Sequence, residues 1–223
     1  MYQSVIFDLD GTLVNSLYDL AGSMNRALMF YGLPAHPVTS YKQFVGNGRG
    51  QLVRRAIGAE HLSEQLIQKV TQFFNQDYAV HCMDQTKPYD GILPMLCSLQ
   101  EKGIQIGVLS NKPDSFVQEM MKKLFPGVAF SAVWGKKDGF APKPDCASVN
   151  AMLEELGCEK QACLYVGDSD VDVYLARNAG LAFCGVQWGF RGEQELLSAG
   201  AQATVQTPEE LLLSQLGAHD FGA

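Results

Sequence analysis

Short runs of consecutive apolar residues alternate with segments of helical periodicity along most of the chain. Each run is continuous rather than alternating in polarity, as expected of strands that helices cover on both faces of a parallel sheet. The predicted strands are residues 5–7, 105–109, 129–133, 163–166 and 181–186. Strand followed repeatedly by helix predicts a doubly wound parallel α/β sheet.

Helix boundary signals lie between these strands. Residues 91–102 have a helical pattern that ends at a glycine, a common C-terminal residue of helices. Pro113 and Pro144 stand where a first helical turn would begin. Residues 207–210 have the order of an N-cap, a proline at the first helical position and the glutamate of a capping box.

One long segment interrupts the alternation of strand and helix. From about residue 16 to residue 86 the chain has helical periodicity only, and we interpret its apolar stripes as core packing. The usual connection between a strand and its helix is about 2–6 residues long. The segment therefore predicts a helical cap inserted at residues 16–85, with an α/β core formed by residues 1–15 and 86–223.

Composition and charge narrow the class of protein. The chain has 223 residues, of which 47% are hydrophobic and 18% charged, as in an ordinary globular protein. Its net charge of -7 and the absence of a cluster of basic residues argue against nucleic acid as a partner. No apolar stretch approaches a membrane span, no signal peptide is evident, and the six cysteines lack metal-binding spacing. These features predict a cytoplasmic protein with no membrane partner.

Acidic residues follow two of the predicted strands, at the edge where open parallel sheets bind ligands. Asp8 and Asp10 come directly after the first strand, and their spacing would place both on one face if the strand continued. Residues 167–172 form a second acidic segment after the fourth strand. Ser169 or Asp170 in that segment could instead cap the following helix.

Other polar groups follow the second and third predicted strands. Ser110 and Asn111 precede a helix, where backbone N–H groups readily bind anions. Lys143 follows the third strand, although a lone lysine is more often a solvated surface charge. Together these residues place carboxylates, small hydrogen-bonding groups and one lysine at one edge of the sheet. Such oxygen ligands suit Mg²⁺, which binds through one or two carboxylates and a substrate phosphate.

The order and context of these motifs resemble the haloacid dehalogenase-like (HAD) superfamily of phosphohydrolases. The DxDGT signature occupies residues 8–12, the Ser/Thr motif is Ser110, the lysine motif is Lys143 with Pro144, and the acidic GDSxxD motif occupies residues 167–172. The resemblance covers nearly the whole chain, including the helical cap, and implies a Rossmann-like core.

The resemblance also implies a catalytic set of Asp8, Asp10, Ser110 and Lys143. Asp8 would attack phosphorus and form an aspartyl-phosphate. Asp10 would first protonate the leaving oxygen and then activate the water that cleaves this intermediate. Gly11, Thr12 and Asn111 would help Ser110 to hold the phosphoryl oxygens.

A magnesium ion is implied as the cofactor. Its protein ligands would be Asp8, the backbone carbonyl of Asp10, and Asp168. Asp172 would lie behind these ligands and orient Lys143 or a metal-bound water.

Within the superfamily the chain is most similar to phosphoglycolate phosphatases. Residues 45–48 of the cap and residues 187–191 carry this likeness. Asn47, Gly48 and Arg49 would bind the leaving group, and Arg49 would favour substrates that bear a carboxylate. The lysine motif lacks the second proline that many relatives carry, which leaves the substrate less defined than the chemistry.

The sequence thus predicts a magnesium-dependent phosphoric monoester hydrolase whose partner is a small phosphorylated metabolite, with 2-phosphoglycolate as the expected substrate. Alternatives of the same fold are an inorganic pyrophosphatase or nucleotidase and a β-phosphoglucomutase-like phosphomutase. A non-catalytic protein that binds a phosphate ligand is a more remote alternative. Asp10 argues against a dehalogenase, which attacks carbon and does not need this second aspartate. The sequence does not determine the oligomeric state.

Overall fold

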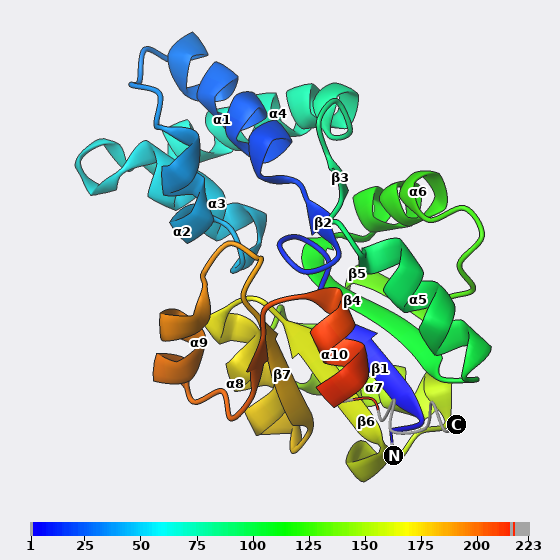
Figure 1. The fold of residues 1–223 in the computed structure, drawn as a ribbon. Coiled ribbons are helices and arrows are strands. Elements are labelled where there is room, and N and C mark those ends of the chain that lie inside the picture. Colours follow the sequence, from blue (N-terminus) through cyan, green and yellow to red (C-terminus); the bar gives the residue numbers. More distant parts are fainter. Residues whose placement is uncertain (1, 215, 217–223) are drawn as a thin grey trace.

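The computed structural model of the protein describes residues 2–214 and 216. Its central sheet has six strands, all paired in parallel (Figure 1). In spatial order they are β5 (Ala132–Lys136), β4 (Gln105–Pro113), β1 (Ser4–Phe7), β6 (Cys163–Gly167), β7 (Ala182–Val186) and β8 (Thr204–Val205). This topology confirms the predicted doubly wound α/β fold.

Helices cover both faces of the sheet, which explains why the strands are apolar throughout. On one face lie α5 (Ile92–Glu101), α6 (Asp114–Leu124) and α10 (Pro208–Ser214), and on the other α7 (Ala147–Leu156) and α8 (Asp170–Ala179), with α9 (Glu193–Ala199) packed beside α8. In β1, Val5 and Phe7 join the core under α5 and α6, whereas Ile6 joins the core under α7. Successive residues of a strand point to opposite faces, so both must be apolar.

Several predicted boundaries differ from the structure. The third strand was expected at residues 129–133 but begins at Ala132, because the apolar residues before it, Val128 and Phe130, instead cover the core as part of a loop. The second strand continues to Pro113, beyond the predicted end. Pro144 lies three residues before α7, which begins only at Ala147.

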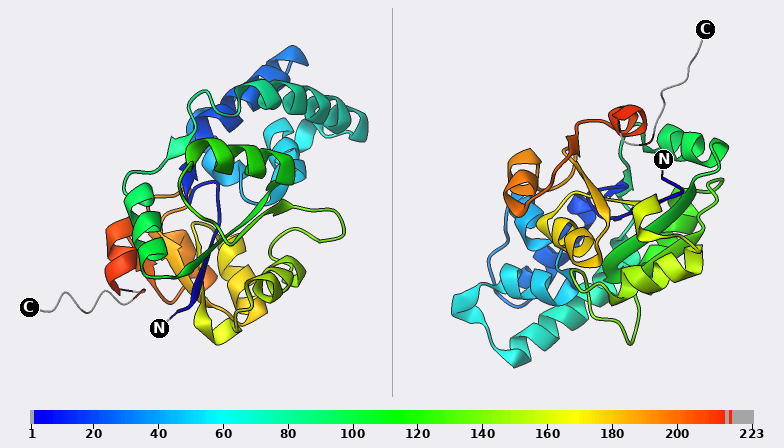
Figure 2. Two further views of the ribbon diagram at one scale, coloured as in Figure 1. Left: turned by 90° about the vertical axis from the view of Figure 1, so that its right-hand side faces the viewer. Right: turned by 90° about the horizontal axis from the view of Figure 1, so that it is seen from below.

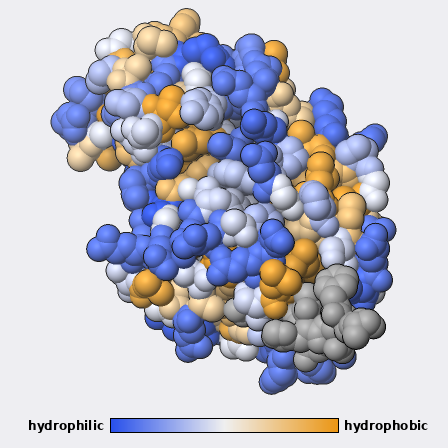
Figure 3. All heavy atoms as spheres, in the orientation of Figure 1, coloured by the Kyte–Doolittle hydropathy of each residue, from blue (hydrophilic) through white to orange (hydrophobic). Residues whose placement is uncertain are grey.

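Residues 17–81, within the long segment between β1 and β4, fold into a helical block. It contains α1 (Leu17–Phe30), α2 (Tyr41–Phe44), α3 (Gly48–Ile57) and α4 (Glu64–His81). The block has a hydrophobic core of its own and lies beyond the carboxyl ends of the strands (Figures 1 and 2). The surface is indented between this block and the α/β core (Figure 3). The division into a cap of residues 16–85 and a two-part core stays a prediction.

Two chain crossings join the helical block to the core. They pair as a short antiparallel ribbon of β2 (Val14–Asn15) and β3 (Lys87–Pro88). The buried carboxylate of Asp19 in α1 accepts hydrogen bonds from the backbone N–H groups of Gln85 and Thr86 and from the Thr86 hydroxyl. A single buried carboxylate therefore ties the start of the first helix to the returning chain.

Two further sequence expectations concern the thiols and the membrane. All six cysteines are free, and four of them are buried: Cys82, Cys158, Cys163 and Cys184. Within the part of the chain that the structure describes, every helix is too short or too polar to cross a bilayer.

Candidate active site

The loop after β1 places Asp8 at the carboxyl edge of the sheet. The Asp8 N–H donates to the carbonyl of Val166 in β6 at 2.9 Å, which keeps this residue in line with the strands. Three successive N–H groups, those of Thr12, Leu13 and Val14, then donate to the Leu9 carbonyl and close a tight turn.

This turn changes which backbone groups are free to bind an anion. The N–H of Gly11 donates to Val14 and that of Thr12 donates to Leu9, although both were expected to hold phosphoryl oxygens. In the described part of the chain, the N–H groups of Leu9 and Asp10 have no such acceptor. They are therefore better candidates for phosphoryl binding than the two residues that the motif suggested.

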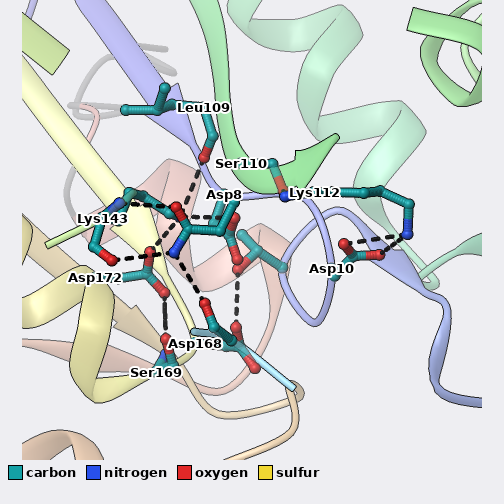
Figure 4. Close-up of polar contacts among 12 residues, drawn as sticks. Asp8, Asp10, Leu109, Ser110, Lys112, Lys143, Asp168, Ser169 and Asp172 are labelled. Carbon is teal, nitrogen blue, oxygen red and sulfur yellow. Dashed lines mark hydrogen bonds and ion pairs between the residues drawn. The ribbon is translucent and has the colours of Figure 1, made fainter. Parts of the chain in front are cut away.

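Lys143 reaches into the edge of the sheet and pairs with Asp8. Its ammonium lies 2.8 Å from Asp8 Oδ1 and 2.8 Å from Asp172 Oδ1, and it also donates to the Leu109 carbonyl and the Tyr165 hydroxyl (Figure 4). The residue is only 5% exposed, so it is not the solvated surface charge that a lone lysine usually is. Burial alone would lower the pKa of Lys143, but Asp172 and Asp8 raise it well above its ordinary value.

Asn111 fixes the loop that carries Lys143. Its side-chain carbonyl accepts from the Lys143 N–H at 2.7 Å, and its amide donates to the Lys143 carbonyl and to the carbonyl of Gly46 in the helical block. The Asn111 side chain therefore positions Lys143 and links it to the block, instead of being free to hold phosphate as expected. Ser110, also buried, lines the same cavity as Asp8.

The acidic segment after β6 contributes two buried carboxylates. Asp168 is 2% exposed and accepts from the Phe190 N–H at 2.7 Å. Asp172 accepts from the N–H and hydroxyl of Ser169 through one oxygen and pairs with Lys143 through the other. Ser169 therefore caps the helix, as one of the two interpretations of this segment proposed, and Asp172 both completes the capping box and pairs with Lys143.

The carboxylates of Asp8, Asp168 and Asp172 form a cluster that could hold a metal ion. One oxygen from each lies within 4.8 Å of the others. Burial raises the pKa of Asp8 to about 7, although the ammonium of Lys143 opposes that shift. The pKa of Asp168 lies well above its usual range because of burial and because of Asp8 and Asp172. A divalent cation would offset this excess of buried negative charge, and carboxylate oxygens are the ligands that Mg²⁺ prefers.

The residues around Asp168 leave no room for larger side chains. A Cβ atom on Gly11, whose φ is +93°, would lie 2.3 Å from Asp168 Oδ2. A Cβ atom on Gly189 would lie 2.3 Å from the Asp168 Cβ. The Trp188 indole N–H donates to the Thr12 carbonyl at 2.9 Å, so residues 187–191 pack the second acidic segment against the first.

The side chain of Asp10 does not share a face with Asp8. Strand β1 ends at Phe7, so the alternation of a continuing strand, on which a shared face depended, does not apply here. Asp10 instead accepts hydrogen bonds from the Ser16 hydroxyl and from the ammonium of Lys112, on the other side of the site (Figure 4). Lys112 was not among the predicted site residues, and its one signal in the sequence is its place two residues after Ser110.

The three cap residues expected to bind the leaving group are divided between two cavities. Gly48 and Arg49 line the cavity that contains Asp8 and Asp10. Asn47 instead lines a separate cavity between α2 and α9. Arg49 is exposed, and its guanidinium donates to the Asn75 side chain at 2.9 Å.

Comparison with known proteins agrees with this geometry. The family model described as haloacid dehalogenase-like hydrolase matches residues 5–186. The chain is 34% identical over 195 residues to a phosphoglycolate phosphatase of Haemophilus influenzae (strain 86-028NP), covering 85% of this chain and 87% of that protein. It is 34% identical to a phosphoglycolate phosphatase of Yersinia pseudotuberculosis, with 84% and 82% covered.

A solved structure supports the same family. A protein from Lactobacillus delbrueckii subsp. bulgaricus, suggested to be a phosphoglycolate phosphatase, superposes with a TM-score of 0.91. The two sequences are 32% identical, and the match covers 94% of this chain and 96% of the other. With its aspartates, serine and lysine gathered at one edge of a parallel sheet, this chain belongs to the haloacid dehalogenase-like hydrolase family.

Proposed function

We propose that this protein hydrolyses a small phosphate monoester, 2-phosphoglycolate, with Asp8 as the nucleophile. The observation that carries the proposal is the buried carboxylate of Asp8, which is held by Lys143 beside Asp168 and lines a small cavity. The choice of substrate rests on the relatives named phosphoglycolate phosphatase at 34% identity.

In the first half of the reaction, an Asp8 carboxylate oxygen forms a bond to phosphorus as the bond from phosphorus to the leaving oxygen breaks. Asp10, which pairs with Lys112 as a carboxylate in this structure, must take up a proton before this step; it then gives that proton to the leaving oxygen, which becomes the hydroxyl of glycolate. Asp10 suits this role because its side chain lies apart from the cluster of Asp8 and Asp168 yet lines the same cavity.

In the second half, water attacks the phosphorus of the aspartyl-phosphate and gives a proton to Asp10. The bond between phosphorus and Asp8 then breaks, which releases inorganic phosphate and restores both carboxyl groups. Both halves use one acid–base residue in opposite directions, and such catalysis is typically worth about 10²–10⁴-fold.

Lys143 and nearby polar groups would hold the phosphoryl oxygens. The Lys143 ammonium lies against the nucleophile, where it offsets negative charge as the oxygen–phosphorus bond forms. The Ser110 hydroxyl and the N–H groups of Leu9 and Asp10 are the further donors that this loop offers.

Asp8 and Asp168, with the backbone carbonyl of Asp10, would hold the magnesium ion. When bound, the ion supplies positive charge beside the transferring phosphoryl group and keeps Asp8 ionised. Both oxygens of Asp172 already accept hydrogen bonds, one from Lys143 and the other from Ser169, so its part is to fix that ammonium rather than to bind the metal directly.

The cavity is partly apolar. Its volume is about 60 Å³, and Val45, Leu52 and Phe74 of the helical block form part of its wall. These apolar walls line the same cavity as Asp8 and Asp10, so a leaving group bound there would meet them.

Phosphate release from 2-phosphoglycolate tests the proposal. The assay compares magnesium with a chelator and includes pyrophosphate, a nucleotide and glucose 1-phosphate as competing substrates. We expect magnesium-dependent release that is fastest with 2-phosphoglycolate. Preference for another compound would refute the substrate, and conversion of glucose 1-phosphate to the 6-phosphate would indicate a mutase.

The Asp8→Asn variant tests the nucleophile. The variant should lose activity on every substrate, because the amide cannot attack phosphorus. It should still unfold in a cooperative thermal transition, which would show that it is folded. Asp90→Asn is the matched control, since Asp90 is exposed. Equal activity of Asp8→Asn and the wild type would refute covalent catalysis at this residue.

A further inference from the structure

The cavity contains a second buried lysine that the proposed hydrolysis does not use. Lys112 lies on β4, two residues after Ser110, and is only 7% exposed. Its side chain lines the cavity with Asp8 and Asp10, on the side opposite to the group formed by Lys143 and Asp172 (Figure 4). An ammonium is costly to bury, so its presence at this place needs a reason.

The contacts of Lys112 come from both parts of the molecule. Its ammonium lies 3.0 Å from Asp10 Oδ1 and 2.7 Å from the hydroxyl of Tyr78, which belongs to α4 of the helical block. It also lies 4.7 Å from the centre of the Tyr78 ring. Burial lowers the pKa of Lys112, but the carboxylate of Asp10 and the Tyr78 hydroxyl more than offset this effect, so the residue is charged.

The two buried lysines of the site differ in how their charge is balanced. Lys143 pairs with two carboxylates, those of Asp8 and Asp172. Lys112 pairs with one, that of Asp10, and its other contact is a neutral hydroxyl. Since the hydroxyl of Tyr78 accepts from Lys112, its own proton can be donated to another acceptor. The Lys112 ammonium donates to both oxygens of Asp10 and to Tyr78, so the pair offers a further anion the positive charge of Lys112 and the hydroxyl proton of Tyr78.

The position of Lys112 relates it to one part of the substrate. In the proposed reaction Asp10 lies within hydrogen-bond distance of the leaving oxygen, and the Lys112 ammonium is 3.0 Å from Asp10. A group on the carbon next to the leaving oxygen would therefore come within reach of Lys112. In 2-phosphoglycolate the carboxylate is attached to that carbon, so it stands close to the ester.

The remaining walls strengthen such a contact. Leu20, Leu52 and Phe74 line the cavity, and all three are buried. Apolar walls exclude water and lower the local dielectric constant, which makes a charge pair inside the cavity stronger than one at the surface. Arg49 also lines the cavity, but it is exposed and already bonded to Asn75.

We propose that Lys112, assisted by the Tyr78 hydroxyl, binds a carboxylate attached to the carbon next to the ester oxygen and thereby determines substrate choice. This inference rests on the proposed function and extends it, since it names the residue that distinguishes a phosphorylated 2-hydroxy acid from a plain alkyl phosphate. It also gives Tyr78 a role in recognition, which makes the contact depend on the helical block lying against the core.

The test compares 2-phosphoglycolate with ethyl phosphate, which has the same length of ester but no carboxylate. The measured quantity is the ratio of kcat/KM for the two substrates within each variant. A ratio is needed because Lys112 touches Asp10, so its removal can slow every substrate. Lys112→Met should lower the ratio by about 10- to 150-fold, the loss expected for one hydrogen bond to a charged group.

Three further variants sharpen the comparison. Tyr78→Phe keeps the ring and removes the hydroxyl, and it should lower the same ratio by about 3- to 10-fold. Lys112→Arg keeps the charge and should retain part of the preference. Lys122→Met, a matched change of an exposed lysine on α6, should leave the ratio unchanged.

The possible results separate this inference from the proposed function. An equal loss on both substrates in Lys112→Met would show that the lysine only positions Asp10, and it would overturn the inference alone. The inference would also be overturned if Lys112→Met left the ratio unchanged while Arg49→Ala lost the preference for 2-phosphoglycolate over ethyl phosphate. A wild type that releases phosphate from neither substrate would overturn the proposed function and this inference with it. If Lys112→Met proves unfolded by thermal melting, Tyr78→Phe decides through the same ratio.

Discussion

Replacing Lys143 by methionine would leave two buried carboxylates without their cation. The ammonium lies 2.8 Å from both Asp8 and Asp172, whose side chains are 11% and 1% exposed. Removing one partner of a buried ion pair typically costs about 3–5 kcal/mol, and water cannot screen these charges. For a domain of this size each kcal/mol lowers the melting temperature by about 2–4 °C, so the expected fall is about 6–20 °C.

Thermal unfolding in a chelator measures this effect. Lys123→Met is the matched control, because Lys123 is exposed and forms a surface pair with Glu119. The melting temperature of this variant should change by no more than about 2 °C. Adding Asp172→Asn to Lys143→Met should recover part of the loss, since it removes one of the unpaired charges. A Lys143→Met protein that melts within about 2 °C of the wild type would refute this account of the site.

Three other outcomes follow from the structure. Asp19→Ala should lower the free energy of unfolding, measured by urea titration, by about 2–4 kcal/mol, because it removes the acceptor of two buried donors of Thr86. A loss below about 0.5 kcal/mol would contradict the role of Asp19 in joining α1 to the returning chain. In a chelator, the raised pKa values of Asp8, to about 7, and of Asp168 mean that these groups favour the folded state less as pH rises through 7. Magnesium should therefore raise the melting temperature more near pH 8 than near pH 5, and an equal effect at both would count against a metal site at these residues. Arg49→Ala should reduce kcat/KM for 2-phosphoglycolate by a few-fold at most while leaving an aryl phosphate nearly unaffected, as steady-state assays would show.

Much of the site could be anticipated because a parallel sheet gathers the ends of its strands. Asp8, Lys143 and Asp168 lie far apart in the sequence, but each follows a strand whose apolar residues mark it as buried. All strands of such a sheet run the same way, so whatever follows them meets at one edge. For these residues, recognising the strands was enough to predict that they lie together.

The direction of a side chain beyond the end of a strand was not predictable in the same way. Asp10 points away from Asp8 because the turn after Phe7 is set by hydrogen bonds to the Leu9 carbonyl, not by the pleat of a strand. The Asn111 amide forms hydrogen bonds with Lys143 and Gly46 because the fold brings those two segments beside it. Local sequence records the residue types but not these partners.

The sequence by itself thus determined the alternation of strands and helices, though not the short sixth strand β8. It also determined the helical composition of the segment from about residue 16 to residue 86 and the chemistry of the groups at the edge of the sheet. Only the tertiary structure decided that Lys112 is buried against Tyr78 and Asp10, and that Asn47 faces a different cavity from Arg49. The physical reason is that periodicity and strand direction are local properties of the chain. The contacts between the helical block and the α/β core depend instead on how two hydrophobic clusters pack against each other. Residues far apart in the sequence form those contacts, so no local pattern predicts them.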